Sequence, residues 1–473
     1  AGKEGVDALN VSRGNVITPA NMYEIPPLDI PKGFNIDNAA KIRKETGMLT
    51  IGVGRLNEPD IAEKVLEEDK VDMVVMGRAQ YADPEFVNKV RDGRTDEITY
   101  CVGCDQGCLD AFADPDCSHV TCLMNPAVGR EKECEIVKTD KPERVLIAGG
   151  GIAGLKAAIT LKQRGHDPIL CEASDTLGGQ FRTAGMAPRK GEMKAAVELM
   201  ARQARALGVD IRLNTTVTPE LIAQIKPHTV FNAIGSQPVI PKFPGVDKPF
   251  VANSHDVLDG KTAVKGNVVV IGGGMVGMEV AEYLEERGSK VTILEMLPEV
   301  CADLGMARKY YLDVHLPELN ITPVTEVAVT SIEDRKVVGK KGDETVEFPC
   351  DYAVIAIGSR SRNGKELEAA AYANGCGYMV IGDAGMARRA LNATREAMDA
   401  ALTFDKPDVH ADIIKPDKVV FMTGASNVIF TGKMTHNELL PILSKSKALL
   451  VNTVKDNNMI SIVEAIAVGT PLT

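Results

Sequence analysis

Four cysteines stand close enough together in the sequence to hold a metal ion or a metal cluster. The first three have C-x2-C-x3-C spacing and the fourth follows after thirteen residues: Cys101, Cys104, Cys108 and Cys122. Four such thiolates can hold either a cubane iron–sulfur cluster or tetrahedral zinc, and the spacing leaves both open. A fifth cysteine, Cys117, lies inside the gap and is the alternative fourth ligand. With no export signal in the sequence, we expect reduced thiols in a cytoplasmic protein.

A second pattern with chemical meaning, G-x-G-x-x-G between an apolar strand and a helix, occurs twice. The first copy contains Gly149, Gly151 and Gly154 and reaches an acid at Glu172. The second contains Gly272, Gly274 and Gly277 and reaches Glu295. In such units the glycines allow a tight turn and close approach of a pyrophosphate to the helix N-terminus, while the acid accepts hydrogen bonds from ribose. Two dinucleotide sites are therefore predicted.

The two copies agree in their internal spacing, which a chance match would not reproduce. Eleven residues after the third glycine comes Gly165 or Gly288, and seven residues later comes the acid. The second acid is followed by Met-Leu-Pro, with no adjacent Arg or Lys to hold a 2′-phosphate. This favours NADH over NADPH as the nicotinamide cofactor.

Residues 142–404 resemble the flavoprotein reductases with two dinucleotide sites, in which an NAD(P) domain interrupts an FAD domain. The motifs that carry this resemblance are Leu177-Gly178-Gly179-Gln180, Ala233-Ile234-Gly235-Ser236-Gln237-Pro238, Ala356-Ile357-Gly358 and Gly382-Asp383. The resemblance implies that Gly179, Gln180, Gly235 and Gly358 belong to cofactor-binding loops and that Asp383 meets the ribityl chain of FAD. Disulphide reduction is not expected, because the remaining cysteines form no C-x-x-C or C-x4-C pair: Cys171, Cys301, Cys350 and Cys376.

The cysteine segment has a more specific resemblance. The run from Tyr100 to Asp110, followed by Cys122-Leu123-Met124-Asn125-Pro126, resembles the iron–sulfur segment of the 2,4-dienoyl-CoA reductase, enoate reductase and trimethylamine dehydrogenase group. Members of that group join an old-yellow-enzyme-like (β/α)8 barrel to this segment and then to an FAD/NAD module. The resemblance implies a 4Fe-4S cluster on the four cysteines, with Cys122 as the fourth ligand because Leu-x-Asn-Pro follows it.

Residues 1–100 alternate strand-like and helix-like runs, as a parallel βα sheet requires. Strands are predicted at 6–11, 48–53 and 71–76, and a helix at 59–68. The resemblance implies the last three βα units of an FMN-binding barrel, whose phosphate site is built by the loops after the final two strands. It assigns Gly54, Arg55, Gly77 and Arg78 to that site. The alternative is glycines at crowded strand ends beside surface arginines.

Three strands cannot close an eight-stranded barrel. The resemblance therefore implies that the first five units, most contacts to the flavin ring and the usual Tyr proton donor lie outside this sequence. Catalytic residues and the substrate are unknown from the sequence alone. We expect the chain as given to be incomplete, to bind FAD, and to hold FMN weakly or not at all.

The end of the chain has a different pattern. Residues 419–473 resemble the donor-binding half of retaining GT-B glycosyltransferases, whose E-x7-E motif would map to Asp456 and Glu464. The resemblance spans too little chain to imply a working transferase. We expect a buried βα fragment or a fused stray segment, as in a chimeric reading frame.

The composition is that of an ordinary folded protein. Apolar residues make up 44% and charged residues 25% of the 473, which excludes a disordered or fibrous chain. A net charge of −11 repels phosphate backbones, so we expect no nucleic-acid partner. No apolar run approaches the roughly 20 residues of a membrane-spanning helix. We expect a small-molecule substrate and no membrane contact, and leave self-association into a homo-oligomer open.

The predicted architecture is α/β, with the C-terminal part of a (β/α)8 barrel, a Cys-rich iron–sulfur segment, two Rossmann-like dinucleotide-binding domains and a short α/β tail. The expected parts are barrel residues 1–100, iron–sulfur segment and linker 101–141, FAD domain 142–250 with 355–404, NAD domain 251–354, linker 405–418 and tail 419–473. Together they predict an NADH-dependent oxidoreductase that passes electrons from NADH through FAD and 4Fe-4S to FMN and reduces an activated C=C bond. The alternatives are an amine dehydrogenase or diaphorase-type protein, and a non-redox, zinc-stapled nucleotide-binding or glycosyltransferase-related protein.

Overall fold

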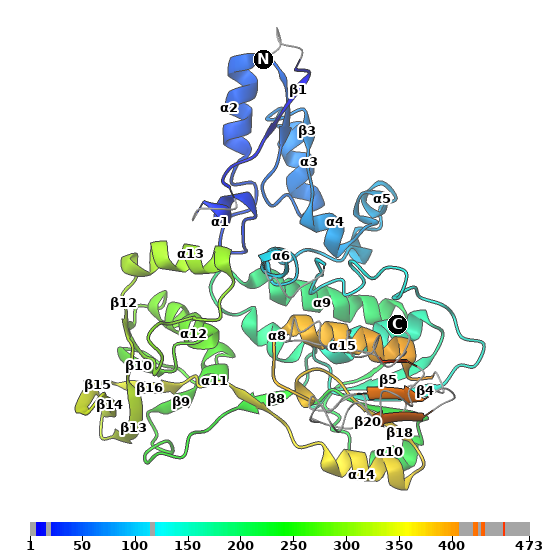
Figure 1. Ribbon diagram of the computed structural model, residues 1–473, viewed down its shortest axis with the longest axis vertical. Helices are drawn as coiled ribbons and strands as arrows, with labels where there is room; N and C mark the ends of the chain where they lie inside the picture. The colour runs from blue at the N-terminus through cyan, green and yellow to red at the C-terminus, as the bar shows by residue number, and fades with distance from the viewer. Residues whose placement is uncertain are drawn as a thin grey trace. The chain divides into compact units, whose positions relative to one another are not determined.

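The structure is a computed structural model that describes residues 6–15, 20–113 and 119–405, and three short strands beyond them (Figure 1). The chain divides into two compact units, one of residues 1–113 and 119–401, the other of residues 114–118 and 402–473. All described residues of the candidate sites lie in the first unit. No helix in the described part of the chain is long and apolar enough to cross a bilayer.

The N-terminal segment forms a three-stranded parallel sheet in the order β1-β2-β3. Its strands are β1 (Ala8–Val11), β2 (Leu49–Gly52) and β3 (Met73–Val74). The three predicted strands and the predicted helix, α3 (Pro59–Glu67), are confirmed. The third strand is shorter than predicted because it has a neighbour on one side only and its ladder stops where β2 ends, with Val75 N donating to the Gly52 carbonyl at 2.9 Å.

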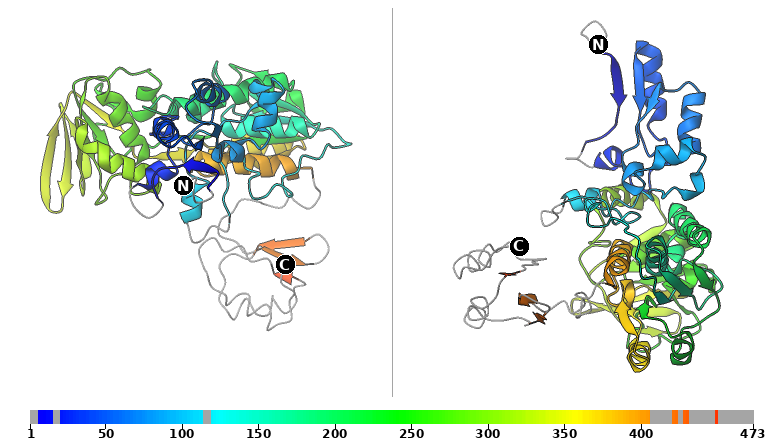
Figure 2. Two further views of the ribbon diagram at one scale, coloured as in Figure 1. Left: turned by 90° about the horizontal axis from the view of Figure 1, so that it is seen from above. Right: turned by 90° about the vertical axis from the view of Figure 1, so that its right-hand side faces the viewer.

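One face of this sheet is covered and the other is not. Helices α2 (Ile36–Thr46) and α3 pack against the covered face, and the right-hand view of Figure 2 shows the blue helices on one side of β1. The core there consists of Val11, Ile36, Ala39, Leu56, Val65 and Val71. On the opposite face Leu49 is 53% and Met73 43% exposed. Parallel sheets are normally covered on both faces, so this sheet has the form of an open barrel section.

The first dinucleotide domain is a five-stranded parallel sheet with helices on both faces. Its strand order is β18 (Gly377–Val380), β7 (Thr229–Asn232), β4 (Arg144–Ala148), β5 (Asp167–Cys171) and β6 (Asp210–Arg212). Leu146 and Ala148 face the core shared with α10 (Pro219–Ile225) and α14 (Lys365–Ala373). Helices α7 (Ile152–Gln163) and α9 (Gly191–Ala206) pack together on the domain. Residues 145–148 of β4 form a continuous apolar run that is buried throughout, so both faces of the strand contribute to the core.

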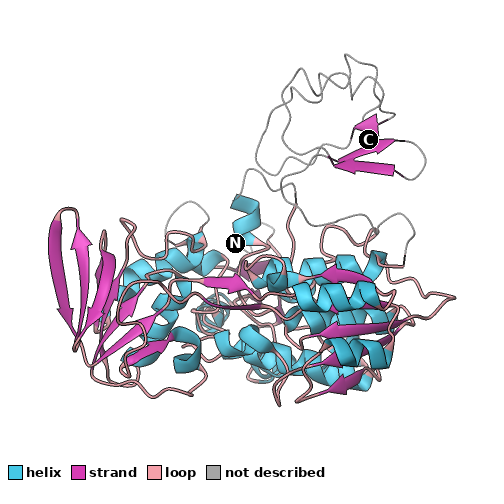
Figure 3. Cartoon of the chain, turned by 90° about the horizontal axis from the view of Figure 1, so that it is seen from below, coloured by secondary structure: helices cyan, strands magenta, loops and turns pink. Residues whose placement is uncertain are grey.

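The second domain repeats the parallel sheet but covers one face differently. Its strand order is β12 (Ile321–Val324), β11 (Lys290–Leu294), β10 (Asn267–Ile271), β16 (Tyr352–Ile355) and β9 (Val251–Asn253). One face packs against α11 (Ser254–Leu258), α12 (Met275–Glu285) and α13 (Met306–His315). The other packs against an antiparallel sheet of β13 (Ala328–Glu333), β14 (Lys336–Lys341) and β15 (Glu344–Pro349), at the left of Figure 3.

The second domain is inserted into the first through two paired connections. These are the antiparallel strands β8 (Ser236–Pro238) and β17 (Ser359–Ser361). The remaining helices are α1 (Asn21–Glu24), α4 (Arg78–Ala82), α5 (Phe86–Arg91), α6 (Leu109–Ala113), α8 (Gly179–Ala184) and α15 (Ala390–Thr403), with 3-10 turns at Thr95–Glu97, Leu316–Glu318 and Gly382–Ala384.

The described strands of the tail are β19 (Val420–Thr423), β20 (Asn427–Phe430) and β21 (Ala448–Leu449). Both β20 and β21 pair with β19 in the antiparallel sense. A βα fragment would give parallel neighbours, so the expectation of such a fragment is wrong for these strands. The residues proposed for the glycosyltransferase motif, Asp456 and Glu464, lie outside the described residues, as does the predicted linker apart from its first residue.

The uneven burial of the N-terminal sheet predicts unequal costs for two similar truncations. Ile36→Ala removes a side chain that is 2% exposed and should cost about 2–5 kcal/mol of local stability. Leu49→Ala, at 53% exposed, should change it by no more than about 0.5 kcal/mol. Hydrogen exchange of the β1–β3 amides in urea measures both. Equal losses would mean that the Leu49 face is covered in solution.

Candidate functional site

The two glycine loops have the same backbone geometry. Their first glycines have φ of +109° at Gly149 and +103° at Gly272, a region that side chains rarely adopt. A Cβ on Gly149 would overlap with the carbonyl oxygen of Ala233, which directly follows β7. A Cβ on Gly272 would overlap with that of Ala356, which directly follows β16. Each loop can therefore turn this tightly only with glycine.

In each loop the third glycine is closely surrounded by other atoms, whereas the second glycine borders open space. A Cβ at Gly154 would overlap with the carbonyl oxygen of Gly149, so the helix approaches the strand as closely as it can; Gly277 is placed in the same way. At Gly151 and Gly274, by contrast, a Cβ would meet no atom within 4 Å. These two glycines precede α7 and α12 and leave open space before the helix N-termini. Each loop thus has the shape that a pyrophosphate group requires.

The predicted acids lie against their own glycine loops. Glu172 Oε2 accepts a hydrogen bond from Gly150 N at 2.7 Å, and Glu295 Oε2 accepts one from Gly273 N at 2.6 Å. The second oxygen of Glu295 accepts from Leu297 N at 2.8 Å. Each oxygen of Glu295 has a further lone pair for a ribose hydroxyl. In Glu172 only Oε2 has one, because Oε1 already accepts hydrogen bonds from Ser174 N and Ser174 Oγ. The residue next to Glu295 is Met296, whose side chain is 70% exposed. This position of the loop therefore carries an uncharged side chain.

The other predicted FAD residues come together from distant parts of the chain. Gln180 Nε2 donates to Ser236 Oγ at 2.8 Å, and Ser236 Oγ donates to Asp383 Oδ2 at 3.0 Å. Gly179, with φ of +49°, stands beside Gly151, since a Cβ on it would lie 3.2 Å from the Gly151 Cα. Segments as far apart in the sequence as residues 180 and 383 therefore border one region next to the first glycine loop.

Gly235 and Gly358 lie in the paired connections between the two domains. Arg362 N donates to the Gly235 carbonyl at 3.0 Å, and Val239 N donates to the Gly358 carbonyl at 2.9 Å. Both glycines have positive φ, +74° and +95°. These two hydrogen bonds tie the two connections together next to Ser236.

The four predicted ligand cysteines border one cavity. None of the four is in a disulfide. Thr121 N donates to the Gly107 carbonyl at 2.6 Å, and a Cβ on Gly107 would overlap with Thr121, so only glycine lets the segment of Cys122 approach that of Cys108. Cys117, the alternative ligand, lies outside the described residues.

The side chains of the described residues do not form a ready-made site for a single metal ion. In the described part of the chain no three His, Cys, Asp or Glu side chains converge closely enough to hold one metal ion. Tetrahedral zinc with Zn–S of about 2.3 Å needs sulfurs less than about 4 Å apart. In a cubane each thiolate binds a different iron, so the sulfurs stand farther apart around a larger body.

Burial makes these thiols poor anions unless positive charge is supplied. It raises the pKa of Cys108 to about 12 and that of Cys122 to about 11, and it raises the pKa of Cys104 well above its ordinary value. Repulsion from Cys122 and Cys101 raises the pKa of Cys104 further. Since ligands bind as thiolates, the cavity fits an occupant that carries several positive charges.

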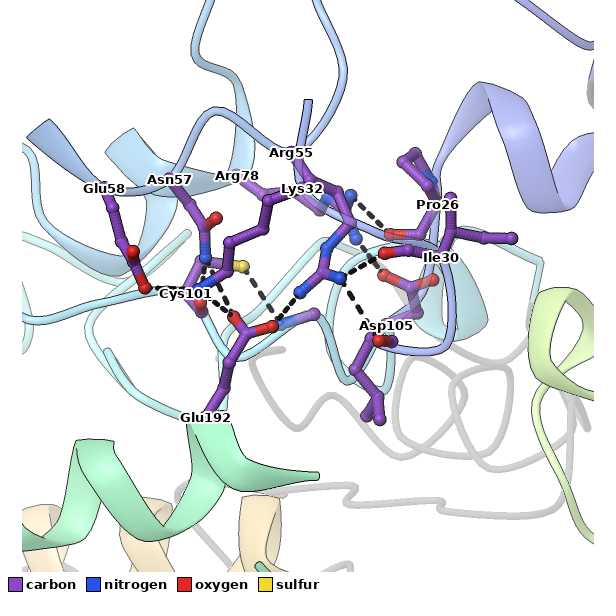
Figure 4. Close-up of polar contacts among 12 residues, drawn as sticks. Pro26, Ile30, Lys32, Arg55, Asn57, Glu58, Arg78, Cys101, Asp105 and Glu192 are labelled. Atoms are coloured by element: carbon purple, nitrogen blue, oxygen red, sulfur yellow. Dashed lines mark hydrogen bonds and ion pairs between the residues drawn. The ribbon is translucent and has the colours of Figure 1, made fainter. Parts of the chain in front are cut away.

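The two arginines proposed for an FMN phosphate have partners within the chain (Figure 4). Arg78 pairs with Asp105 and donates to the Pro26 carbonyl at 2.7 Å. Arg55 is buried, donates to the Leu28 and Ile30 carbonyls and pairs with a glutamate of α9. A phosphate role for these side chains stays a prediction.

The glycines proposed for the same phosphate site differ in their surroundings. A Cβ on Gly77 would meet no atom within 4 Å, whereas one on Gly54, with φ of +144°, would lie 3.0 Å from the Phe34 ring. The backbone at Gly77 therefore faces open space, as a phosphate site needs. The role of both glycines stays a prediction.

Sequence analysis missed the ionic contacts that join these segments. Glu192, in the first turn of α9, pairs with Arg55 and Lys32 and accepts a hydrogen bond from Asn57 Nδ2 at 3.1 Å. Asn57 Nδ2 also donates to the Cys101 carbonyl at 2.6 Å. Figure 4 shows Glu192 rising from its helix toward these side chains. From the sequence alone, Glu192 is only an acidic residue in the first turn of a helix, where its charge interacts favourably with the helix dipole.

A second missed group joins the two dinucleotide domains to the N-terminal segment. Lys190 forms a buried ion pair with Glu279 of α12, and Arg189 pairs with Glu282 at 2.7 Å. Asp29 accepts from Arg308 Nε at 2.8 Å. Burial opposes ionisation of Asp29, but Arg308 and Arg189 together hold its pKa below the ordinary value. These contacts border a cavity of about 320 Å³.

In comparison with known proteins, two family models match separate parts of the chain. Residues 143–385 match the family described as pyridine nucleotide-disulphide oxidoreductase, and residues 3–97 match the NADH:flavin oxidoreductase / NADH oxidase family. An NADH oxidase of Thermoanaerobacter brockii is 36% identical over 404 residues, which cover 84% of this chain and 61% of that protein. A bilirubin reductase of Mediterraneibacter gnavus is 34% identical over 360 residues, covering 76% of this chain and 56% of that protein.

Among solved structures, a 2-naphthoyl-CoA reductase matches with a TM-score of 0.79 and 28% identity, over 84% of this chain and 60% of that one. The chain thus spans less than two thirds of the length of these relatives. The resemblance to the dienoyl-CoA and enoate reductase group and the predicted fold class are confirmed. The chain belongs to the pyridine nucleotide-disulphide oxidoreductase family and carries a segment of the NADH:flavin oxidoreductase / NADH oxidase family before it.

Proposed function

We propose that this chain is the electron-supplying part of an NADH-dependent flavin and iron–sulfur oxidoreductase that reduces an activated C=C bond in an enone or enoyl-CoA type of small molecule. The observation that carries the proposal is the gathering of four half-buried thiols around one cavity in a chain with two dinucleotide loops. The similarity to a bilirubin reductase and a 2-naphthoyl-CoA reductase, both named for conjugated substrates, supports the type of bond.

Each group of residues has a defined task in this proposal. When bound, FAD accepts hydride from NADH, a 4Fe-4S cluster carries single electrons, and FMN delivers them to the substrate. The loop of Gly272 and Gly274 would hold NADH, with Glu295 orienting its ribose. The loop of Gly149 and Gly151 would hold FAD, with Glu172 in the matching place.

The remaining tasks belong to the cysteine cavity and the N-terminal segment. Cys101, Cys104, Cys108 and Cys122 would hold the cluster. The buried apolar side chains of Val102, Leu123 and Met124, which line the same cavity, would limit the access of water to it. The backbone of Gly54 and Gly77 would position the FMN phosphate. No residue described here is assigned to protonate the substrate.

The proposal is tested by anaerobic purification followed by analysis of iron, sulfide, zinc, FAD and FMN. We expect four iron and four sulfide per cubane cluster, one FAD and no stoichiometric zinc. Turnover with NADH is then compared for enones, enoyl-CoA thioesters and secondary amines. A colourless zinc protein, or turnover of amines alone, would contradict the proposal.

The choice of the fourth ligand gives a sharp pair of variants. Cys122→Ser should lose most of the iron and the visible absorbance of the cluster, because a neutral hydroxyl replaces a thiolate ligand. Cys117→Ser, the matched control, should retain both. Iron content and absorbance near 400 nm measure the difference. The reverse result would assign the fourth ligand to Cys117.

The preference for NADH follows from the charge beside the second loop. The Glu295 carboxylate should repel a 2′-phosphate, and no cation stands next to it. We expect the double change Glu295→Ala, Met296→Arg to move the ratio of kcat/KM toward NADPH at least tenfold, about 1.4 kcal/mol. Glu172→Ala, the matched change in the first loop, should weaken FAD retention and leave that ratio unaltered. A wild-type protein that prefers NADPH would contradict the assignment.

A further inference from the structure

One ion pair borders the cavity of the four thiols. Arg78 is the first residue of α4, directly after Gly77 in the N-terminal segment, and Asp105 stands between Cys104 and Cys108. Both side chains line the cavity, and their side-chain exposures are 17% and 2%. Figure 4 shows both side chains in the same group of polar contacts as Cys101. The pair therefore joins the N-terminal segment to the wall of the cavity.

The carboxylate is turned toward the sulfurs as well as toward the arginine. Cys108 Sγ donates to Asp105 Oδ1 at 4.0 Å. Asp105 Oδ2 is buried and has no hydrogen-bond partner among the described residues. Buried ion pairs contribute little net stability because desolvation offsets their attraction. A half-satisfied carboxylate at this place is therefore poorly explained by stability alone.

Other charges near the thiols are placed differently. Arg55 acts on Cys101, but its charge is matched by Glu192 outside the cavity wall. Lys156 of α7 acts on Cys122 and does not line the cavity, and Asp110 lies one turn beyond the cysteines. Arg78 and Asp105 are the charged residues among those that line it.

We propose that Arg78 and Asp105 set the reduction potential of the cluster that the four cysteines hold, with opposite signs. This inference rests on the proposed function, because it takes the occupant of the cavity to be a redox cluster. Adding an electron makes the cluster one charge more negative. A fixed cation beside it stabilises the reduced form and a fixed anion destabilises it, the more so in a dry site.

The two residues act through the cluster and do not touch substrate, so they are positioning residues. Arg78 raises the potential and Asp105 lowers it. Because Arg78 belongs to the segment that carries the proposed FMN phosphate site, the potential depends on that segment being docked. An N-terminal segment displaced from the cysteines would leave Asp105 unpaired and the cluster harder to reduce.

The test is an EPR-monitored redox titration of the full chain at pH 8 after iron and sulfide analysis. Arg78→Gln should make reduction of the cluster at least tenfold less favourable, a shift of about −59 mV for one electron. Asp105→Asn, nearly isosteric, should shift the potential upward. Arg78→Lys keeps the charge and should stay close to the wild type.

The matched control is Arg43→Gln, which breaks a bidentate pair with Asp72, both bonds 2.9 Å. Arg43 lies in the last turn of α2 and Asp72 directly before β3, and neither lines the cysteine cavity. It should leave the potential unchanged. The inference is overturned if the reduction potential shifts in the same direction in Arg78→Gln and Asp105→Asn, or if it shifts in neither variant. The proposal that the cysteines hold a cluster would survive either result. Absence of iron and sulfide from the wild-type chain would overturn the inference and the proposed function together. If Arg78→Gln loses its cluster, Asp105→Asn and Arg78→Lys decide the question.

Discussion

Charge compensation at the cysteine cavity is the constraint on which the rest of this structure depends. Four half-buried thiols line one cavity, and desolvation there disfavours their anionic form. Cations reach the neighbourhood from separate segments: Arg78 and Arg55 from the N-terminal sheet and Lys156 from the first dinucleotide helix. Each segment therefore has an electrostatic reason to pack against the cysteines, and Glu192 compensates the excess positive charge that results.

The dinucleotide domains show how one backbone solution serves two chemistries. The loops at Gly149 and Gly272 have matching φ values and matching acid contacts. What differs is the surroundings: the first loop faces Gln180, Ser236 and Asp383, whereas exposed apolar residues follow the second acid. In the proposed function the shared part would recognise a pyrophosphate, and the differing parts would separate a bound flavin from a nicotinamide that is exchanged during turnover.

Much of this organisation could be predicted because it depends on local patterns. Strands at 8–11 and 49–52 follow from apolar runs, and the loops follow from glycines at fixed spacing. The contacts of Arg55 with Glu192 and of Lys190 with Glu279 could not be predicted. Their partners are far apart in the sequence, and a single charged residue has no periodicity that points to its partner. The phosphate role predicted for Arg55 and Arg78 likewise takes no account of their carboxylate partners, Glu192 and Asp105.

The antiparallel pairing of β8 with β17 has a consequence for how the chain is assembled during synthesis. The first domain needs β18, residues 377–380, to complete its sheet beside β7, residues 229–232. The whole second domain is translated between these two strands. It can close its own sheet as soon as β16 is made, while β7 still has an open edge. During synthesis the second domain can therefore fold before the first domain is complete. Any delay in folding would leave the β7 edge of the first domain exposed.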